Sequence, residues 1–418
     1  MDILEDLKWR GAINQQTDAN GLKALLDEGP ISLYCGTDPT GDSLHVGHLI
    51  PFIVLKRFQM AGHRPYILIG GGTGTIGDPS GRSTERVLQT RETVQRNEEA
   101  LTDQMIRLFG TENFNIVDNC DWLDRMSLLS FLRDYGKDFS VNAMLSKESV
   151  SSRMANGISF TEFSYQILQS IDFLYLYEKR NVQLQIGGAD QWGNLTDGVD
   201  LIHRKHNDAK VYGLTIPLML KADGTKFGKS AGGAVWLDPK KTSPYEFYQF
   251  WINQDDHDVV KYLKYFTFLS HEEIDELAAK TQEHPEQREA QRRLAQEVTA
   301  FVHGAQAMKE AEKISQVLFN GNVADLTADE VEQAFEKVPS VTIAANKANI
   351  VEMLVISGIE KSKRQAREDI ANGAITINGE KITDVNAEID PSTSFNGRYV
   401  VVRRGKKKYT LAHVEDGE

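Results

Sequence analysis

The sequence predicts an α/β protein with a parallel-sheet domain, then a helical domain, then a small α+β domain at the C-terminus. Over the first 220 residues, short apolar runs ending in turn residues alternate with amphipathic stretches, which is the pattern of βαβ units. After residue 240 the apolar residues recur at helical spacing. After residue 350 a helical stretch precedes strand-like runs, and Asn378-Gly379 among them indicates a hairpin turn.

The strands of the parallel sheet are predicted from five apolar runs. In chain order these are residues 31–38, 66–72, 113–122, 182–188 and 211–220. The stretch from Ser43 to Met60 predicts a helix after the first strand, and Pro51 is expected to remove one backbone hydrogen bond and kink it. Residues 90–180 are mainly helical in pattern, which indicates a helical insertion into the sheet.

Capping signals divide the helical region. A Ser or Thr is followed three residues later by Glu, the capping-box pattern, at Ser243–Glu246, Ser270–Glu273 and Thr327–Glu330. Pro285 is expected to break the helix between the last two. The predicted domains are therefore 1–225, followed by a loop at 226–230, then 231–337, a linker at 338–350, and 351–418.

Charge is distributed unevenly along the chain. Asp and Glu number 60 and Lys and Arg 47, for a net charge of -13, but residues 351–418 hold 11 of each sign. Basic residues cluster at 362–367 and 403–408, so the acidic total does not exclude a nucleic-acid partner. Two cysteines cannot form a disulfide framework, and no Cys/His group has zinc-site spacing. The absence of a long apolar run and of a signal-like start indicates a soluble cytoplasmic protein with no membrane contact.

Residues 38–49 join the first strand to the first long helix and contain His45 and His48. Their spacing places both on one face at a helix N-terminus, where free N–H groups and the helix dipole suit a phosphate. Gly47 leaves room for a base or ribose to approach the backbone. A pair of partly exposed surface histidines is the alternative interpretation.

The glycine-rich loop 71–81 follows the second strand. Its Gly72, Gly74 and Gly77 suggest a dinucleotide site, but that motif opens a helix directly, whereas here the chain continues as loop through Asp78. We therefore expect a turn whose backbone closely approaches a ligand, with Asp78 available to an ammonium group.

The loop 221–230 places Lys226, Lys229 and Ser230 close together. Two ammonium groups and a hydroxyl could neutralise a polyphosphate transition state. A lysine-bearing hairpin loop is the commoner explanation of such a segment.

The stretch 160–176 predicts a helix with an apolar face and a polar stripe of Tyr165, Gln169 and Asp172 beside it. Inward-facing carboxylates and amides cost free energy unless they are hydrogen-bonded, so this stripe predicts a pocket for a small polar or phenolic ligand. A stripe that simply meets water is the alternative. Residues 185–194 carry Gly-Gly, Asp190 and Gln191 at the carboxyl end of a strand, where ligands bind in open α/β sheets.

Together these motifs resemble the class I aminoacyl-tRNA synthetases, and among them the bacterial tyrosyl-tRNA synthetases. The segment 45–48 is similar to the HIGH signature and 226–230 to the KMSKS loop, in the order that the family has. Residues 362–367 and 373–379 are similar to an S4-type RNA-binding module. The resemblance implies a Rossmann-like catalytic domain over 1–225, a helical anticodon-side domain over 231–337 and an S4-like RNA-binding domain over 351–418.

The resemblance also implies a two-step reaction. L-tyrosine and ATP would give tyrosyl-adenylate and pyrophosphate, and the tyrosyl group would pass to the 3′-terminal ribose of tRNA(Tyr). Because the substrate carboxylate is the nucleophile, catalysis would rest on positioning and charge stabilisation. Mg²⁺ is expected on the ATP phosphates, with no tightly bound protein metal, and a homodimer is expected.

Residue roles follow from the matched motifs. Candidate catalytic residues are Thr40, His45, His48, Arg82, Arg86, Lys226, Lys229 and Ser230. Candidate ATP-binding residues are Cys35, Gly36, Asp38, Gly47, Gly188, Asp190, Gln191 and Lys229. Tyr34 and Asp172 would bind the phenol of tyrosine, and Asp78, Tyr165 and Gln169 its ammonium group. Arg82 stands where relatives often have Lys, which keeps the charge but changes its shape.

Candidate tRNA contacts lie mainly in the two basic clusters: Lys363, Arg364, Arg367, Arg403, Arg404, Lys406, Lys407 and Lys408. Lys147, Arg153 and Trp192 are candidates for the acceptor end. Phosphate contacts would make binding strongly dependent on salt. A solubilising basic face is the alternative.

Two other functions stay open on the sequence alone: an RNA-binding protein on a non-catalytic synthetase scaffold, and a tryptophan-specific relative. The intact 45–48 and 226–230 motifs argue against the first. Asp172 and Tyr34, together with the S4-like tail, favour tyrosine over tryptophan.

Overall fold

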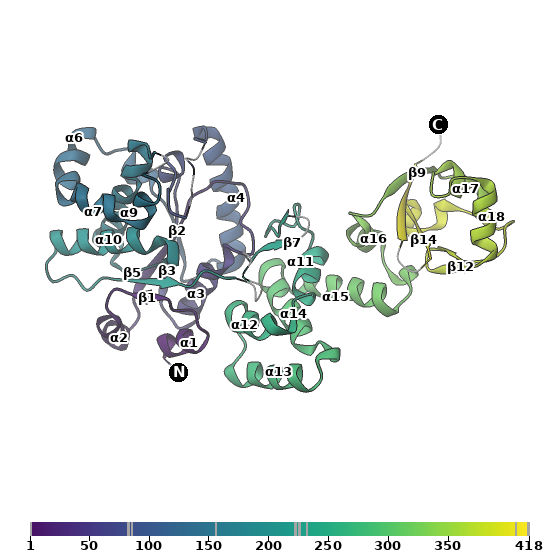
Figure 1. Cartoon of the computed structure of the whole chain (residues 1–418), viewed down its shortest axis with the longest axis horizontal. Helices are drawn as coiled ribbons and strands as arrows, with labels where there is room; N and C mark the ends of the chain where they lie inside the picture. Colours follow the sequence, from purple (N-terminus) through teal and green to yellow (C-terminus); the bar gives the residue numbers. More distant parts are fainter. Residues whose placement is uncertain are drawn as a thin grey trace. The chain divides into compact units, whose positions relative to one another are not determined.

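The computed structural model of the chain describes residues 2–81, 84, 87–154, 157–220, 224, 227–230, 233–405 and 408–415, with the backbone alone at 229, 230 and 320. It consists of two compact units (Figure 1). The first unit comprises residues 1–241 and 254–297, and the second comprises 242–253 and 298–418. The predicted helical domain 231–337 is therefore divided between them, because α11 (Pro244–Ile252) packs on α15 (Ala305–Asn320) while α12 (Asp256–Phe266) packs on helices of the first unit.

A six-stranded sheet forms the centre of the first unit, in the order β1-β6-β5-β2-β3-β4. The strands are β1 (Gln15–Gln16), β2 (Ser32–Thr37), β3 (Arg64–Ile69), β4 (Asn115–Asp118), β5 (Val182–Gly188) and β6 (Tyr212–Ile216). From β6 to β4 all neighbours are parallel, and β1 adds an antiparallel edge. The five predicted strands are confirmed, while β1, with only two residues, is too short to leave an alternating pattern.

Helices cover both faces of this sheet (Figure 1). The helices α3 (Leu49–Met60) and α4 (Arg91–Phe109) follow β2 and β3, whereas α9 (Phe160–Arg180) and α10 (Trp192–Lys205) pack together beside β5. Strand order runs outward in one direction through β3 and β4 and in the other through β5 and β6. The reversal between β2 and β5 opens a crevice at the carboxyl ends of these strands, the usual ligand position in such sheets.

The start of α3 differs from the sequence prediction. The helix begins at Leu49 with His48 as its N-cap, so Pro51 is the third helical residue. Because the N–H groups of the first turn have no intrahelical partner, proline removes no hydrogen bond there. The helix runs unbroken to Met60, and the predicted kink is wrong.

All three predicted capping signals are confirmed as N-caps, and two of them as full capping boxes. The side chain of Ser243 accepts from the backbone of Glu246 at the start of α11. Full capping boxes begin α13 (His271–Glu283) and α16 (Ala328–Phe335). The helix α13 ends two residues before Pro285, as predicted.

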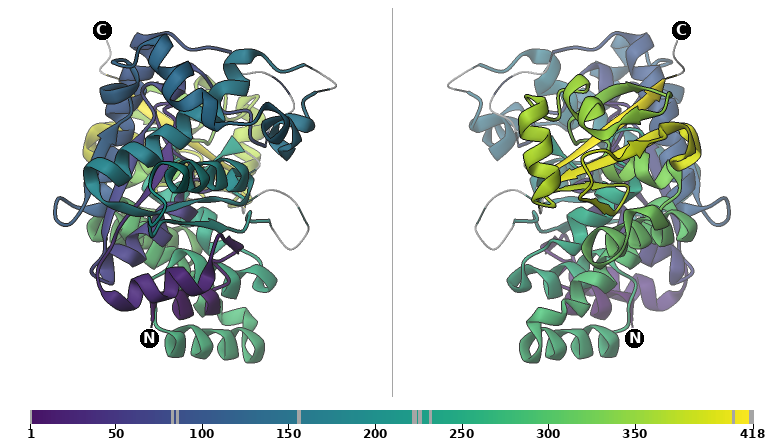
Figure 2. Two further views of the ribbon diagram at one scale, coloured as in Figure 1. Left: turned by 90° about the vertical axis from the view of Figure 1, so that its left-hand side faces the viewer. Right: turned by 90° about the vertical axis from the view of Figure 1, so that its right-hand side faces the viewer.

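A five-stranded sheet lies in the second unit, in the order β12-β11-β14-β15-β9. Its strands are β11 (Ile375–Ile377), β12 (Glu380–Ile382), β14 (Tyr399–Arg404), β15 (Lys408–Glu415) and β9 (Ser340–Ala344). Figure 2 (right) shows the hairpin β14–β15 in yellow beside the helix α18 (Lys363–Ala371). The turn of the β11–β12 hairpin has positive φ at Asn378 (49°) and Gly379 (90°), which confirms the predicted tight turn.

The predicted linker at 338–350 is wrong. Residues 340–344 form β9, which pairs in parallel with β15 and completes the C-terminal sheet. Only Ile343 of this strand is buried, so the segment has no apolar alternation from which to predict a strand. Among the described helices, none is both long and apolar enough to cross a membrane.

Candidate active site

A cavity of about 200 Å³ lies at the point where strand order reverses. Twelve predicted site residues line it: Tyr34, Cys35, Gly36, Asp38, Thr40, His48, Asp78, Tyr165, Gln169, Asp172, Gly188 and Gln191. They come from the end of β2 and the loop after it, the N-cap of α3, the loop after β3, the helix α9, and the end of β5 with the turn that follows it. The predicted residues His45, Gly47 and Asp190 do not line it.

Asp172 is the most deeply buried acid of this cavity, with 2% of its surface exposed. Asn119 Nδ2 donates to its Oδ2 at 3.0 Å, and Trp122 Nε1 donates to its Oδ1 at 2.7 Å. Burial raises the pKa of Asp172 to about 8, and the two hydrogen bonds act against this rise. Since both oxygens already accept from the protein, the carboxylate is oriented to accept a further donor from the cavity.

Tyr34 lies on β2 beside Asp172 and is 1% exposed. Within the described part of the chain its hydroxyl has no hydrogen-bond partner, and the same holds for the side-chain oxygen of Gln185 on β5. Burial, followed by the Asp172 charge, raises the pKa of Tyr34 well above its ordinary value, so its hydroxyl stays protonated. Buried polar groups are normally paired, so these atoms point to a polar ligand.

Asp38 connects β2 to α9. It accepts from Tyr165 Oη at 2.9 Å and from Thr73 Oγ1 at 2.8 Å. Asn119 Nδ2 in turn donates to Thr73 Oγ1 at 2.8 Å, so the network continues to Asp172. Burial and then the Asp38 charge raise the pKa of Tyr165 well above its ordinary value.

A second polar group lies between the loop after β3 and α10. Gln191 Nε2 donates to Asp78 Oδ2 at 2.7 Å, and Asn194 Nδ2 donates to Gln169 Oε1 at 3.0 Å. Asp78 is 8% exposed and also accepts from the backbone of Ser80. These carboxylate and amide oxygens are acceptors of the kind that an ammonium group requires.

The two predicted signature motifs meet beside this cavity. The rings of His45 and His48 stack with centroids 3.8 Å apart, and the backbone of Gly47 donates to His45 Nδ1 at 3.0 Å. A Cβ atom at Gly228 would lie 3.2 Å from the backbone nitrogen of Gly47. The segments around Gly228 and Gly47 therefore pack backbone against backbone. Gly228 also has φ of +93°, which a residue with a side chain rarely adopts.

Several predicted residues lie outside the described part of the chain: Arg82, Arg86, Lys226, Lys406 and Lys407. For Lys229 and Ser230 only the backbone is described, as strand β7 paired with β8 (Gly233–Ala234). Cys35 is 3% exposed, and burial raises the pKa of its thiol to about 12, so it is a small buried residue rather than a nucleophile.

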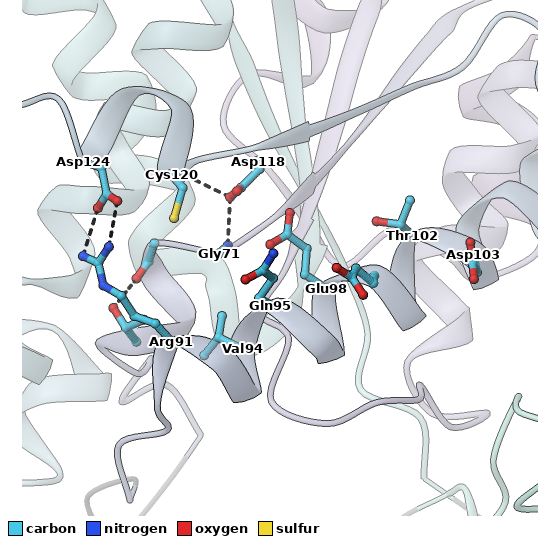
Figure 3. Close-up of a pocket in the computed structure, with 13 residues that line it drawn as sticks. Gly71, Arg91, Val94, Gln95, Glu98, Thr102, Asp103, Asp118, Cys120 and Asp124 are labelled. Atoms are coloured by element: carbon cyan, nitrogen blue, oxygen red, sulfur yellow. Dashed lines mark hydrogen bonds and ion pairs between the residues drawn. The ribbon is translucent and has the colours of Figure 1, made fainter.

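A larger cavity, of about 580 Å³, lies on the other side of the loop after β3 (Figure 3). Asp118 at the end of β4 accepts there from the backbone of Gly71 and of Cys120. Burial, and then Asp118, raise the pKa of Glu98 to about 7. Because the converging donors and orphaned hydroxyl lie in the smaller cavity, we assign the chemistry there and regard Asp118 as a support of the loop.

Sequence reasoning missed Thr73, Asn119, Trp122 and Gln185. Asn119 and Trp122 lie just past β4, within a segment predicted as strand to residue 122. A polar residue directly after a parallel strand is the signal that could have identified Asn119, as it did Asp190.

Two predicted tRNA contacts are placed differently by the structure. Arg153 is 2% exposed and paired with Glu162 at 2.8 Å, so it stabilises the interior and does not face RNA. Arg404 pairs with Glu360 at 3.0 Å and Asp369 at 2.7 Å, which links β14 to α18 and uses the donors that a phosphate would need. The sequence shows a charge cluster but not which of its members has an acid in reach.

The other predicted tRNA contacts are accessible to different degrees. Lys363, Arg364 and Arg367 are exposed on α18, and Lys363 pairs with Glu352 at 2.8 Å. Lys408 is exposed, whereas Arg403 is half-buried and donates to Thr376 Oγ1 at 3.2 Å. Lys147 pairs with Asp197 at 2.7 Å, and Trp192 is partly buried at the start of α10. Among the described side chains, no group of His, Cys, Asp and Glu is arranged to hold a metal ion.

Comparison with known proteins decides the family. A profile described as tRNA synthetases class I (W and Y) matches residues 26–320. The chain belongs to this family. A second profile, for the SYY-like C-terminal domain of tyrosine–tRNA ligase, matches residues 330–412.

Relatives and solved structures agree with this assignment. The chain is 69% identical to the tyrosine–tRNA ligase of Lactiplantibacillus plantarum, over 99% of this chain and all of that protein. It is 68% identical to that of Limosilactobacillus reuteri, again over 99% of this chain and all of the relative. A C-terminally truncated mitochondrial tyrosyl-tRNA synthetase from Aspergillus nidulans superposes with a TM-score of 0.68 at 30% identity, covering 76% of this chain and 94% of that one. The fold is therefore that of a class I synthetase with a mixed, mainly parallel sheet, followed by a C-terminal domain.

Proposed function

We propose that this chain is a tyrosine–tRNA ligase, which activates L-tyrosine with ATP and transfers it to tRNA(Tyr). The observation that carries the proposal is the pair of Tyr34 and Asp172 at the base of the cavity. Tyr34 offers a buried hydroxyl that has no hydrogen-bond partner among the described residues, and Asp172 offers a carboxylate whose oxygens already accept from Asn119 and Trp122. The family assignment and the high identity to tyrosine–tRNA ligases support the same activity.

Tyrosine fits this pair through its phenol. In its ionised form the Asp172 carboxylate only accepts, so the substrate hydroxyl would donate to it and accept from Tyr34. The ammonium group would lie among Asp78, Gln169 and Tyr165, where carboxylate and amide oxygens converge. A substrate without the hydroxyl would leave two buried polar groups unpaired, which is how such a site rejects phenylalanine.

Adenylate formation needs no protein nucleophile, because the tyrosine carboxylate attacks the α-phosphate of ATP and pyrophosphate leaves. The free N–H groups at the start of α3, close to His45 and His48, suit the phosphates. Thr40 and the cations at 82, 86, 226 and 229 would stabilise the leaving pyrophosphate, with Ser230 as a further donor. Cys35, Gly36, Gly188, Asp190 and Gln191 would lie along the adenosine. Mg²⁺ would arrive on the ATP phosphates.

ATP–pyrophosphate exchange tests this proposal, with tyrosine, tryptophan or no amino acid as the substrate. We expect exchange that depends on tyrosine. Preference for tryptophan would overturn the choice of substrate, and no exchange with either would favour an RNA-binding protein on a non-catalytic scaffold.

For tRNA we propose that the C-terminal sheet with α17 (Ile350–Ile356) and α18 forms an S4-like RNA-binding domain. The support is the run of exposed cations at the start of α18, Lys363, Arg364 and Arg367, with Lys408 exposed on β15. Positive side chains on one short helix suit a phosphate backbone, so binding should weaken steeply as salt rises. The helices of the 231–337 region would face the anticodon side.

We further propose a homodimer acting in the cytoplasm, where tRNA and ATP are found. Large apolar side chains are exposed in the segment that precedes α9 and at its first residue: Leu128, Leu129, Leu132, Val141 and Phe160. Monomers rarely leave such surface uncovered, and a second copy of the chain is the occupant we propose. Light scattering would test this: a monomeric mass at micromolar concentration would overturn it.

A further inference from the structure

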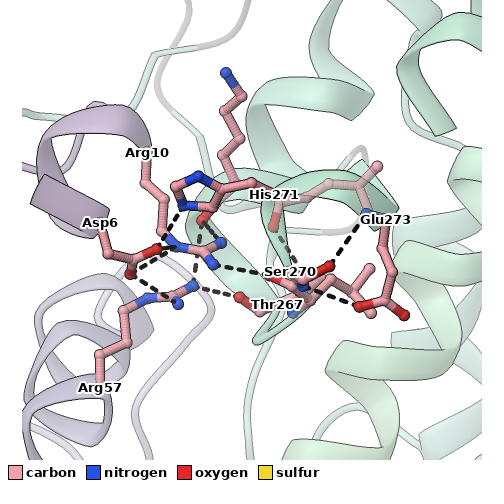
Figure 4. A network of polar contacts seen from close by, with 10 residues as sticks. Asp6, Arg10, Arg57, Thr267, Ser270, His271 and Glu273 are labelled. Carbon is pink, nitrogen blue, oxygen red and sulfur yellow. Dashed lines mark hydrogen bonds and ion pairs between the residues drawn. The ribbon is translucent and has the colours of Figure 1, made fainter. Parts of the chain in front are cut away.

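A buried polar cluster lies far along α3 from the histidine motif, where α1 (Ile3–Trp9), α3 and the turn from α12 to α13 meet (Figure 4). Two guanidinium groups are almost fully buried in it, Arg10 at 5% and Arg57 at 6% exposure. Among the described residues one carboxylate serves both of them: Asp6 bonds Arg10 at 2.9 Å and lies 3.7 Å from Arg57. His271 also bonds Asp6, at 2.8 Å.

The two arginines use their other donors on the C-terminal end of α12. Arg57 donates to the carbonyl oxygens of Lys264 and Thr267, and Arg10 donates to those of Lys264 and Leu269. The last carbonyls of a helix have no intrahelical partner and carry the negative end of its dipole, so two cations there are favourable. We call Asp6, Arg10, Arg57 and the carbonyls of residues 264–269 the arginine clamp.

Burial and the neighbouring charges shift the pKa values of the groups in the arginine clamp. Burial, followed by the Arg10 charge, lowers the pKa of Arg57 to about 9, and Asp6 opposes this change. Burial disfavours the ionised form of Asp6, but the hydrogen bonds from Arg10 and His271 and the two arginine charges outweigh it and lower its pKa. Buried cations are retained only where their donors are satisfied, so the geometry of this end of α12 is tightly specified.

The other side of α12 holds the second signature motif. Phe227 is 7% exposed and packs on Tyr262 and Phe266 of α12, with ring centroids at 4.9 and 5.1 Å. The next residue, Gly228, lies against the backbone of Gly47. The backbone of Val235, just beyond the loop, donates to Gly228 and accepts from Val46. The helix α12 therefore links the body of α3 to the loop that covers the start of α3.

We propose that Arg57 is a positioning residue for the activation reaction, which through the arginine clamp fixes α12 and thereby the loop at 227–230 against residues 45–48. This inference rests on the proposed function. Arg57 lines neither cavity and would act on the phosphate side of the site, not on tyrosine binding. A small displacement of the loop is sufficient, because rates fall steeply when reacting groups are misplaced by about 1 Å.

The test compares Arg57→Met and Arg57→Lys with the wild-type full-length protein. Active-site titration first gives the fraction of functional sites, so that misfolded protein does not count. The tyrosine dissociation constant is then measured without ATP, and the rate constant of adenylate formation is measured by rapid mixing. For Arg57→Met we expect an unchanged tyrosine dissociation constant and a rate constant lower by roughly tenfold to a hundredfold.

Arg57→Lys should recover part of the lost rate, because it keeps the charge but not the planar guanidinium, whose Nη2 reaches two carbonyls while Nη1 faces Asp6. Arg293→Met is the matched control, since Arg293 pairs instead with Glu273 and Glu297 and should keep the wild-type rate. A rate per active site equal to wild type in Arg57→Met would overturn the inference. So would an equal loss in tyrosine affinity and rate, which a general structural role predicts.

A double-mutant cycle tests the route through α12. Phe227→Leu should lower the rate constant of adenylate formation. In the double variant with Arg57→Met, the fold-decrease of that rate constant should be smaller than the product of the two single fold-decreases. Independent effects that multiply would refute the coupling. If the wild-type protein shows no tyrosine-dependent exchange, the proposed function fails and this inference with it; an active wild type with a normal Arg57→Met variant refutes the inference alone.

Discussion

Asn119→Ala would test the support of the candidate tyrosine pocket. Asn119 is fully buried, donates to Asp172 at 3.0 Å and to Thr73 at 2.8 Å, and accepts from the backbone of Gly72 at 2.8 Å. The bond to a carboxylate contributes roughly 1.5–3 kcal/mol, and its loss leaves Trp122 as the remaining donor to Asp172 among the described side chains. If that whole energy is lost from ligand binding, tyrosine affinity falls about tenfold to a hundredfold.

The assay is equilibrium binding of tyrosine without ATP, at a pH where Asp172 is ionised. Gln291→Ala is a suitable control, because Gln291 is equally buried and bonds Asp256, yet it does not line the cavity. It should lower stability while leaving tyrosine affinity unchanged. An Asn119→Ala protein that is folded and binds tyrosine as wild type does would refute the role of the Asn119–Asp172 bond in recognition.

Three further predictions follow from the same geometry. Tyr34→Phe should weaken tyrosine binding by about twofold to tenfold, the worth of one neutral hydrogen bond, and should reduce discrimination against phenylalanine; equal discrimination in kcat/KM would contradict this. Since burial raises the pKa of Asp172 from 3.8 to about 8, its protonated form contributes stability below pH 4 that is lost as the pH rises to 8. The free energy of unfolding of wild type relative to Asp172→Asn should therefore fall over that window, and parallel pH profiles in urea titrations would refute the shift. Arg404→Met should lower the Tm of the C-terminal unit, because it removes the cation that pairs with buried Glu360. Arg364→Ala with Arg367→Ala should instead leave the Tm unchanged and weaken tRNA binding with a smaller salt slope; the reverse pattern would contradict the assignment.

The strands of the first sheet could be predicted because each is a short apolar run closed by turn residues. The predicted range 182–188 matches β5 residue for residue, and helical spacing predicts the stripe of Tyr165, Gln169 and Asp172, which lines the cavity. The strand β9 could not be predicted from the sequence in the same way, because only one of its five residues is buried. Its place in the sheet depends on a partner more than sixty residues away in the chain.

Whether a predicted cation is free to bind a ligand depends on acidic side chains that only the fold brings close to it. Arg153 and Arg404 look like free cations in the sequence, and only the fold brings Glu162, Glu360 and Asp369 to them. The arginine clamp was invisible for the same reason, since Arg10, Arg57 and the carbonyls of α12 are far apart along the chain. Charge clusters therefore predict where cations are, but not which of them are available to a ligand.

The proposal that this pocket recognises the phenol of tyrosine is tested most directly by amino-acid discrimination in ATP–pyrophosphate exchange. The quantity is kcat/KM for tyrosine divided by that for phenylalanine, measured on wild type and on Tyr34→Phe. The Tyr34 hydroxyl, which has no partner in the described part of the chain, and the oriented carboxylate of Asp172 predict a large ratio for wild type and a clearly smaller one for the variant. Comparable kcat/KM for the two amino acids in wild type would contradict the account.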